Sequence, residues 1–116
     1  MKPYSLSMLE ELDDKPQMRQ LVELFLTNTP LQIRDLLAEA GNKEWKKVYA
    51  NAHKLKGGAG IFQASELVVL SQQIEKLANV PGGSAVDEDS VNGLLLSLTA
   101  AFSKIEILLS EELKNL

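Results

Sequence analysis

The strongest constraint on the fold is a run of apolar side chains that recur every three or four residues in the middle of the chain. Between positions 45 and 62 the intervals are three, four, three, four and three residues. An α-helix turns once in about 3.6 residues, so this spacing places all of them on one helix face, as in helices packed in a bundle. The residues are Trp45, Val48, Ala52, Leu55, Ala59 and Phe62.

The same period continues after a turn that we predict at residues 63–65. The next helix carries a second apolar stripe, and a last helix, capped by Asp87 or Asp89, carries a third. Pro81–Ser84 predicts the loop between these two helices. The stripes are Leu67, Leu70, Ile74 and Leu77, then Val91, Leu94 or Leu95, Leu98, Phe102, Ile105, Leu109 and Leu113.

The first third of the chain predicts further helices. Ser5–Leu12 suggests a short leading helix, and a longer one opens at Lys15-Pro16. We expect the chain to restart at Thr29-Pro30, because Thr caps helices well and Pro is accepted at the first helical position. That helix stops at Gly41-Asn42. The predicted fold is all-α: one domain over residues 1–116, an antiparallel up-and-down four-helix bundle with a short extra N-terminal helix.

Composition excludes several classes of function. A chain of 116 residues without cysteine has no room for a two-domain enzyme and no thiolate metal site or Cys nucleophile. Its net charge of −4 argues against binding to nucleic acid or to anionic membranes. No signal peptide is evident, and the most apolar stretch, Leu94–Phe102, is shorter than the roughly 20 residues of a spanning helix. We expect a cytoplasmic protein, and a monomer because the bundle uses the apolar stripes.

His53 is the only histidine of the chain. A lone histidine on a helix is more often part of the core than of a functional site. Here, however, it directly follows the stripe residue Ala52, which turns it about 100° away from the core. We therefore expect an exposed or half-exposed imidazole, sharing its helix face with Lys46, Tyr49, Lys56, Gly57 and Gly60.

Three glycines follow the histidine inside a strong helical pattern. Each of Gly57, Gly58 and Gly60 costs the helix about 1 kcal/mol relative to Ala. Either they fray the helix end or allow close helix packing, or they leave a bare patch through which another protein approaches the imidazole. We favour the bare patch, with Lys56 as a cation beside the ring that suits an attached anion.

Glu75 is predicted to face His53 across the helical hairpin. The two residues lie eleven positions on either side of Ala64, so antiparallel helices place them at the same height. A carboxylate that accepts a hydrogen bond from one ring nitrogen fixes the tautomer and leaves the other nitrogen nucleophilic. Gln72 and Ser71 are weaker candidates for the same role.

This set of groups suits reversible phosphoryl transfer, in which positioning and charge neutralisation supply most of the catalysis. It does not suit hydrolysis, because neither an oxyanion hole nor a second acid–base group is evident. One histidine without a Glu-x-x-His pair is also too few ligands for zinc or di-iron, so we expect no metal site on this chain.

Residues 52–60, Ala-His-Lys-Leu-Lys-Gly-Gly-Ala-Gly, closely resemble the His-x-Leu-Lys-Gly signature of histidine-containing phosphotransfer (HPt) domains. The resemblance extends over residues 5–115. It implies that His53 accepts a phosphoryl group on its outer ring nitrogen, that Lys56 lies beside this group and that Gly57 gives the partner room. Glu75 matches a position that often carries Glu or Gln bonded to the inner nitrogen.

The resemblance also implies the partners. Family members relay phosphoryl groups between aspartates of response-regulator receiver domains, so we expect receivers and a hybrid sensor histidine kinase to dock over Tyr49, Lys54, Gly57 and Gly60. Members do not bind ATP, and this chain has no glycine-rich nucleotide loop followed by Lys-Ser/Thr, so no autokinase activity is expected. It needs no cofactor of its own, because magnesium comes with the receiver. One departure is Phe62-Gln63-Ala64, where many members have Leu-Gly-Ala.

Two alternatives stay open. The chain could be an adaptor bundle that binds a receiver or a helix without phosphorylation, although an adaptor would not need the imidazole. It could instead be a substrate domain that a separate ATP-binding kinase domain phosphorylates directly.

Overall fold

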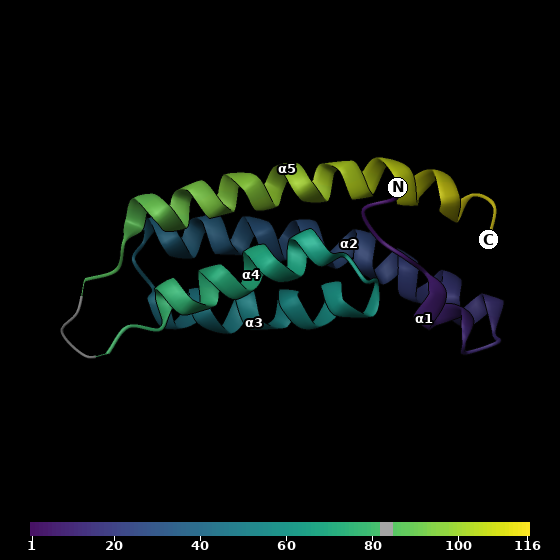
Figure 1. The fold of residues 1–116 in the computed structure, drawn as a ribbon, viewed down its shortest axis with the longest axis horizontal. Helices are drawn as coiled ribbons and strands as arrows, with labels where there is room; N and C mark the ends of the chain where they lie inside the picture. The colour runs from purple at the N-terminus through teal and green to yellow at the C-terminus, as the bar shows by residue number, and fades with distance from the viewer. Residues whose placement is uncertain (82–84) are drawn as a thin grey trace.

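The computed structural model describes residues 1–81 and 85–116, and every regular element in them is a helix (Figure 1). Four long helices run antiparallel in chain order, and a single turn of helix precedes them. They form a rod of 49 × 22 × 22 Å. The predicted all-α class and bundle architecture are therefore confirmed. The helices are α1 (Ser7–Glu10), α2 (Lys15–Gly41), α3 (Trp45–Ile61), α4 (Ser65–Ala78) and α5 (Glu88–Leu113).

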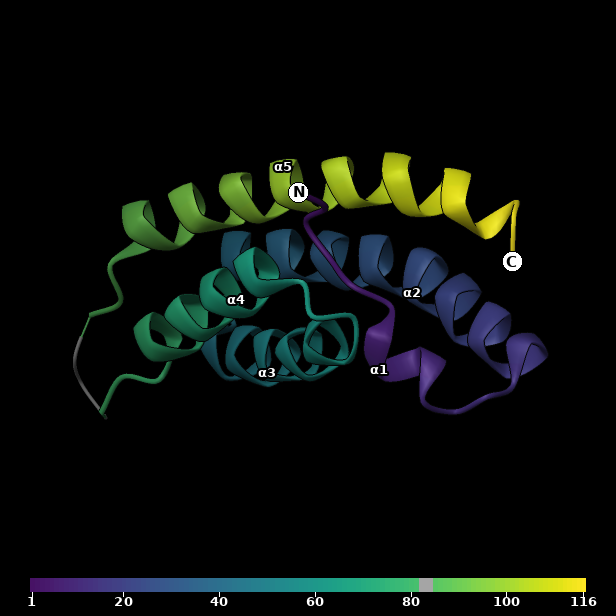
Figure 2. The ribbon, with the colours of Figure 1, turned by 45° about the vertical axis from the view of Figure 1, so that its right-hand side comes forward.

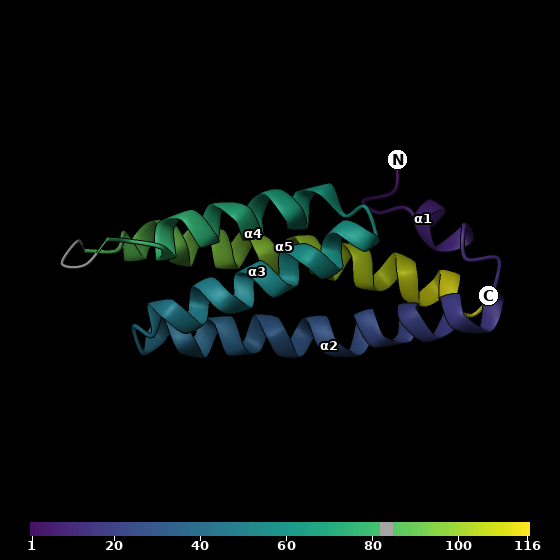
Figure 3. The same cartoon turned by 90° about the horizontal axis from the view of Figure 1, so that it is seen from below.

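The helices close a ring in which α3 and α5 lie diagonally opposite each other. Helix α3 packs against α2 and α4, and α5 packs against the same two helices. The view from below shows α3 in front of α5, on the opposite side of the bundle (Figure 3). The outer faces of α3 and α5 consequently point in opposite directions.

The prediction that one helix ends and a second begins at Thr29-Pro30 is wrong. Residues 15–41 form one helix with Pro30 inside it, and Asp14 caps it by accepting a hydrogen bond of 3.0 Å from the Gln17 amide. Pro30 removes one helical hydrogen bond, but the buried stripe passes through it without a change of phase, so packing of both halves outweighs the loss. The stripe is Met18, Val22, Phe25, Thr29, Ile33, Leu36 and Ala40.

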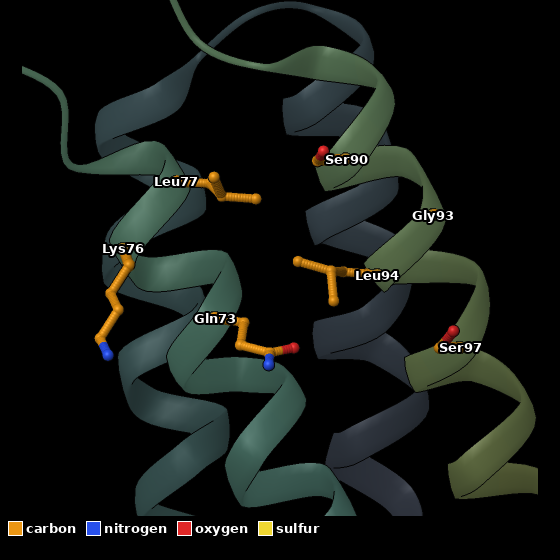
Figure 4. Close-up of a pocket in the computed structure, with 7 residues that line it drawn as sticks. All are labelled: Gln73, Lys76, Leu77, Ser90, Gly93, Leu94 and Ser97. Carbon is orange, nitrogen blue, oxygen red and sulfur yellow. The ribbon is translucent and has the colours of Figure 1, made fainter.

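The buried stripe of α4 is also shifted from the prediction. Leu67 and Ile74 are fully buried as expected, but Leu70 and Leu77 are only half-buried. The small residues Ser71 and Ala78 take their places in the stripe. Small side chains there let α3 and α4 approach closely, whereas Leu77 points across towards α5 (Figure 4).

Backbone hydrogen bonds hold the turn between α3 and α4. Gln63 adopts a left-handed conformation with φ 49°, and the Ala64 amide donates to the carbonyl of Ala59 at 3.0 Å. The N-terminal segment, which runs from α5 across the bundle to α1 (Figure 2), braces this turn, because the Ser5 amide donates to the carbonyl of Phe62 at 2.8 Å. The turn thus forms without the glycine that many HPt domains have at this position.

The last helix begins where one of the two predicted caps lies. Asp87, rather than Asp89, caps α5, since its side chain accepts from the Ser90 amide at 3.1 Å. Residues 82–84 of the predicted loop lie outside the described residues.

Candidate functional site

His53 lies on the outer face of α3, with 64% of its side chain exposed. Its neighbour Ala52 is fully buried, so the change from core to surface takes place within one residue. The ring of Tyr49, one turn earlier, lies nearly parallel to the imidazole at 12°, with 6.4 Å between the ring centroids. The predicted exposure of the imidazole is confirmed, and the ring is not part of the core.

Glu75 reaches His53 from the neighbouring helix α4. Its Oε1 lies 3.5 Å from His53 Nδ1, which is longer than a usual N–H···O hydrogen bond. Only 10% of the Glu75 side chain is exposed. The equal heights predicted from the hairpin are thus observed, but Glu75 lies deeper than a residue on the bundle surface.

Lys56 contacts the same carboxylate oxygen. Its Nζ lies 3.0 Å from Glu75 Oε1, and 28% of its side chain is exposed. Burial of a carboxylate is destabilising unless a positive charge is near. The ammonium group of Lys56 therefore offsets the desolvation of Glu75. Oε1 nevertheless accepts no well-aligned hydrogen bond from any residue that the structure describes. The sequence predicts both residues beside His53, but it does not reveal that they pair with each other.

The glycines on this face are not explained by contacts within the chain. A Cβ added to Gly57, Gly58 or Gly60 would meet nothing within 4 Å, and none of the three adopts a left-handed conformation. Helix α3 also continues past them to Ile61, so they do not fray it. Fraying and close helix packing are therefore both excluded. The glycines leave bare backbone next to the imidazole, and Gly57 and Gly60 are exposed.

A shallow apolar groove borders this bare patch, and the sequence analysis missed it. It lies between α2 and α3, has a volume of about 200 Å³ and includes Leu24, Gly58 and Ile61 in its lining. Leu24 is 50% exposed and Ile61 is 46% exposed. The available signal was that both large apolar residues fall outside the buried stripes of their helices.

The remaining predicted residues differ in their placement. Tyr49 and Lys54 are exposed on α3, and Tyr49 also lines a cavity of about 420 Å³ together with Lys43 and Lys46. Gln72 is exposed on α4 and has no hydrogen bond or ion pair to His53 within residues 1–81 and 85–116. Ser71 is fully buried, and its Oγ has no hydrogen-bond partner among the described residues.

A larger cavity, about 640 Å³, lies elsewhere, in a groove between α4 and α5 (Figure 4). Leu77 and Leu94 point towards each other across it. Its lining contains neither a histidine nor a carboxylate, and none of the predicted site residues belongs to it. The cavity is therefore separate from the imidazole and its carboxylate neighbour.

Comparisons with known proteins identify the family of the chain. Residues 20–114 match the Hpt domain family. The chain is 28% identical over 94 residues to the virulence sensor protein BvgS of Bordetella parapertussis and 27% identical to that of Bordetella bronchiseptica. Each alignment covers 81% of this chain but 7% of the relative, so the chain spans a small fraction of those proteins.

A solved structure is similar over nearly the whole chain. The HPT domain from the Hpt sensor hybrid histidine kinase of Shewanella superposes with a TM-score of 0.75. The match covers 96% of this chain and 90% of the other, at 17% sequence identity. This likeness supports the bundle fold.

Proposed function

Because the chain belongs to the Hpt domain family, which serves phosphotransfer in two-component signalling, we propose that it is a phosphorelay intermediate that carries a phosphoryl group on His53. The donor is the phosphoaspartate of a receiver domain, and the acceptor is the aspartate of another receiver. A hybrid sensor histidine kinase supplies the first receiver, and the relay operates in the cytoplasm.

The observation that carries the proposal is the exposed imidazole with Nδ1 next to a buried carboxylate. With the proton on Nδ1, the lone pair of Nε2 attacks the phosphorus of the aspartyl phosphate. A P–N bond forms as the P–O bond breaks, and the aspartate leaves as a carboxylate. The ring then carries a positive charge, which Glu75 stabilises across 3.5 Å.

Lys56 has a second role in this mechanism. Before transfer its ammonium group neutralises Glu75 at 3.0 Å. Once the ring is positively charged, Glu75 has a second positive neighbour, and Lys56 is free to turn its flexible side chain towards the phosphoryl oxygens. The loss of one ion pair is then offset by another.

The bare patch at Gly57 and Gly60 is where the receiver docks, with Tyr49 and Lys54 at its edges. Bare backbone lets the acidic pocket of the receiver approach the imidazole, which a larger side chain one turn away would obstruct. The apolar groove at Leu24 and Ile61 extends the surface towards α2.

Incubation with a receiver phosphorylated on aspartate tests the proposal. We expect labelled phosphate to move to the wild-type chain and not to His53→Gln, which leaves the chain without any histidine. Labelling of His53→Gln would refute the assignment. Binding without labelling of the wild type would favour an adaptor, and labelling only by an ATP-loaded kinase domain would favour a kinase substrate domain.

A further inference from the structure

Helix α5 carries apolar residues on the face that points away from the bundle as well as on its core face. By length and composition it is apolar enough to cross a membrane, yet only 33% of its most apolar stretch is buried. Leu96 is 71% exposed and Ile107 is 67% exposed. The bundle therefore accounts for only one of the two apolar faces. The predicted stripe of α5 lies on that face, and Leu96 and Ile107 lie outside it.

The outer stripe is symmetrical about the middle of the helix. Leu96, Ala100, Ser103 and Ile107 follow at intervals of four, three and four residues, and all are exposed. This spacing places them along one line on the helix surface. Two large residues enclose two small ones, so the order of sizes is the same in both directions. Two antiparallel copies would bring Leu96 against Ile107 of the second copy, and Ala100 against Ser103.

The charges at the two ends of the stripe fit the same register. Asp89 and Lys114 continue the line outwards and lie equally far from its centre. Each would therefore meet the other residue of the second copy, which gives two ion pairs per dimer. Within the described part of the chain, Lys114 pairs with Glu111 at 3.1 Å and with no other carboxylate, and both side chains are at least 70% exposed. Gly93 and Ser110, the intervening positions, are small enough for the helices to approach.

The flanking charges do not oppose this register. No like charges are brought face to face, because the remaining charged residues of the outer surface meet uncharged ones. Lys104, Glu106 and Glu111 would face Thr99, Ser97 and Asn92 of the second copy, respectively. A match of size, of end charges and of flanking residues in a single register favours a second copy of this chain over an unrelated apolar partner.

We propose that the chain forms a symmetric antiparallel dimer through the outer face of α5. The dimer leaves phosphotransfer possible, because α3 and α5 lie on opposite sides of the bundle (Figures 1 and 3). His53, which is 64% exposed on α3, is therefore not covered in either copy. One helix face per copy buries less than the roughly 1,200 Å² of a standard stable interface, so the dimer is weak and depends on concentration.

Sedimentation equilibrium of the 116-residue chain over a range of concentrations tests the dimer. We expect a dissociation constant between about 10 µM and 1 mM, weakened at least tenfold by Leu96→Glu. The matched control is Val69→Glu on α4, where Val69 is 51% exposed but lies outside the stripe. A monomeric wild type at about 1 mM, or equal weakening by both variants, would overturn the proposal.

Two further variants test the orientation. Asp89→Lys and Lys114→Asp should each weaken the dimer several-fold, and the double variant should recover wild-type affinity. The chain contains no cysteine, so oxidation of an equal mixture of Ala100→Cys and Ser103→Cys chains is expected to give mainly the mixed disulfide. Predominance of the two like-with-like disulfides would show a parallel arrangement and contradict the proposed register, as would additive weakening by the double charge reversal.

Discussion

Glu75 is the residue on which the candidate site depends most, because one carboxylate oxygen faces two basic neighbours. Its Oε1 lies 3.5 Å from His53 Nδ1 and 3.0 Å from Lys56 Nζ. Phosphorylation at Nε2 with the proton kept on Nδ1 makes the ring positive. In the proposed mechanism, the carboxylate therefore favours the loaded form of the imidazole.

We expect Glu75→Gln to slow phosphoryl transfer to His53 by about tenfold, which corresponds to about 1.4 kcal/mol. The amide oxygen remains a neutral acceptor facing Nδ1, but it lacks the charge that stabilises the loaded ring in the proposed mechanism. The measurement is the rate of label transfer from a phosphorylated receiver. Glu106→Gln, an exposed change of the same charge on α5, is the control. Equal rates for wild type and Glu75→Gln would contradict the role of the carboxylate.

A second residue-level prediction concerns the N-terminal segment. The Tyr4 hydroxyl donates a short hydrogen bond to Glu112, and Lys2 pairs with the same carboxylate at 3.1 Å. The hydrogen bond from Tyr4, together with Lys2, lowers the pKa of Glu112 below its ordinary 4.5. Burial, reinforced by Glu112, raises the pKa of Tyr4 well above its ordinary 10.0.

The hydrogen bond between Tyr4 and Glu112 therefore stabilises the fold at pH values between the ordinary pKa values of the two groups. Its contribution is lost as the pH falls below about 4.5, because Glu112 becomes protonated, and as it rises above about 10, because the unfolded state ionises Tyr4 first. We expect the difference in unfolding free energy between wild type and Tyr4→Phe to be largest near pH 7 and to shrink at both ends. Urea unfolding at several pH values measures it, and a constant difference would disprove the linkage.

At this scale the sequence predicts positions better than contacts. Counting residues from the hairpin is enough to place Glu75 opposite His53, since helical rise and period are fixed. The Lys56–Glu75 ion pair cannot be predicted in this way, because a lysine side chain has many rotamers and its choice depends on burial of the carboxylate. For the same reason the burial of the Glu75 side chain, which is only 10% exposed, does not follow from the spacing.

Helices α2 and α3 each contain residues that disfavour helix. The two helices contain them for different reasons. Pro30 is tolerated because both halves of α2 bury one continuous stripe. The local rule for proline predicts a break there, whereas the unbroken spacing from Met18 to Ala40 predicts a single helix, and packing decides between them. Packing within the chain does not explain the glycines of α3. We attribute them instead to the space that a docking partner needs.

This difference predicts opposite effects on stability and transfer at Gly57. We expect Gly57→Leu to raise the free energy of unfolding by about 0.5–1 kcal/mol, because Leu favours helix and a Cβ there meets nothing within 4 Å. The same change should slow transfer at least tenfold, because the side chain obstructs the receiver.

The control is Gly41→Leu. Gly41 lies at the far end of α2, and a Cβ there would also meet nothing within 4 Å. Chemical denaturation and the rate of label transfer are the two measurements. Unimpaired transfer by Gly57→Leu would contradict the bare patch, whereas slower transfer together with lower stability would point to a damaged fold instead.

At the scale of the whole molecule, the ring order of the helices separates two surfaces. The outer face of α3 carries the imidazole, and the outer face of α5 carries the second apolar stripe, on the opposite side. The all-α class and the antiparallel order follow from helical spacing and short connections. The spacing does not show which apolar residues stay exposed. Leu95 is buried and Leu96 is exposed, and the two differ only in the direction in which each points from α5.

The most direct test of the account is nitrogen-15 NMR of the imidazole before and after reaction with a phosphorylated receiver. We expect one phosphoryl group per chain, bonded to Nε2 of His53, while Nδ1 keeps its proton next to Glu75. A phosphoryl group on Nδ1, or a ring left unmodified by every receiver and kinase domain that phosphorylates related Hpt domains, would contradict the central claim.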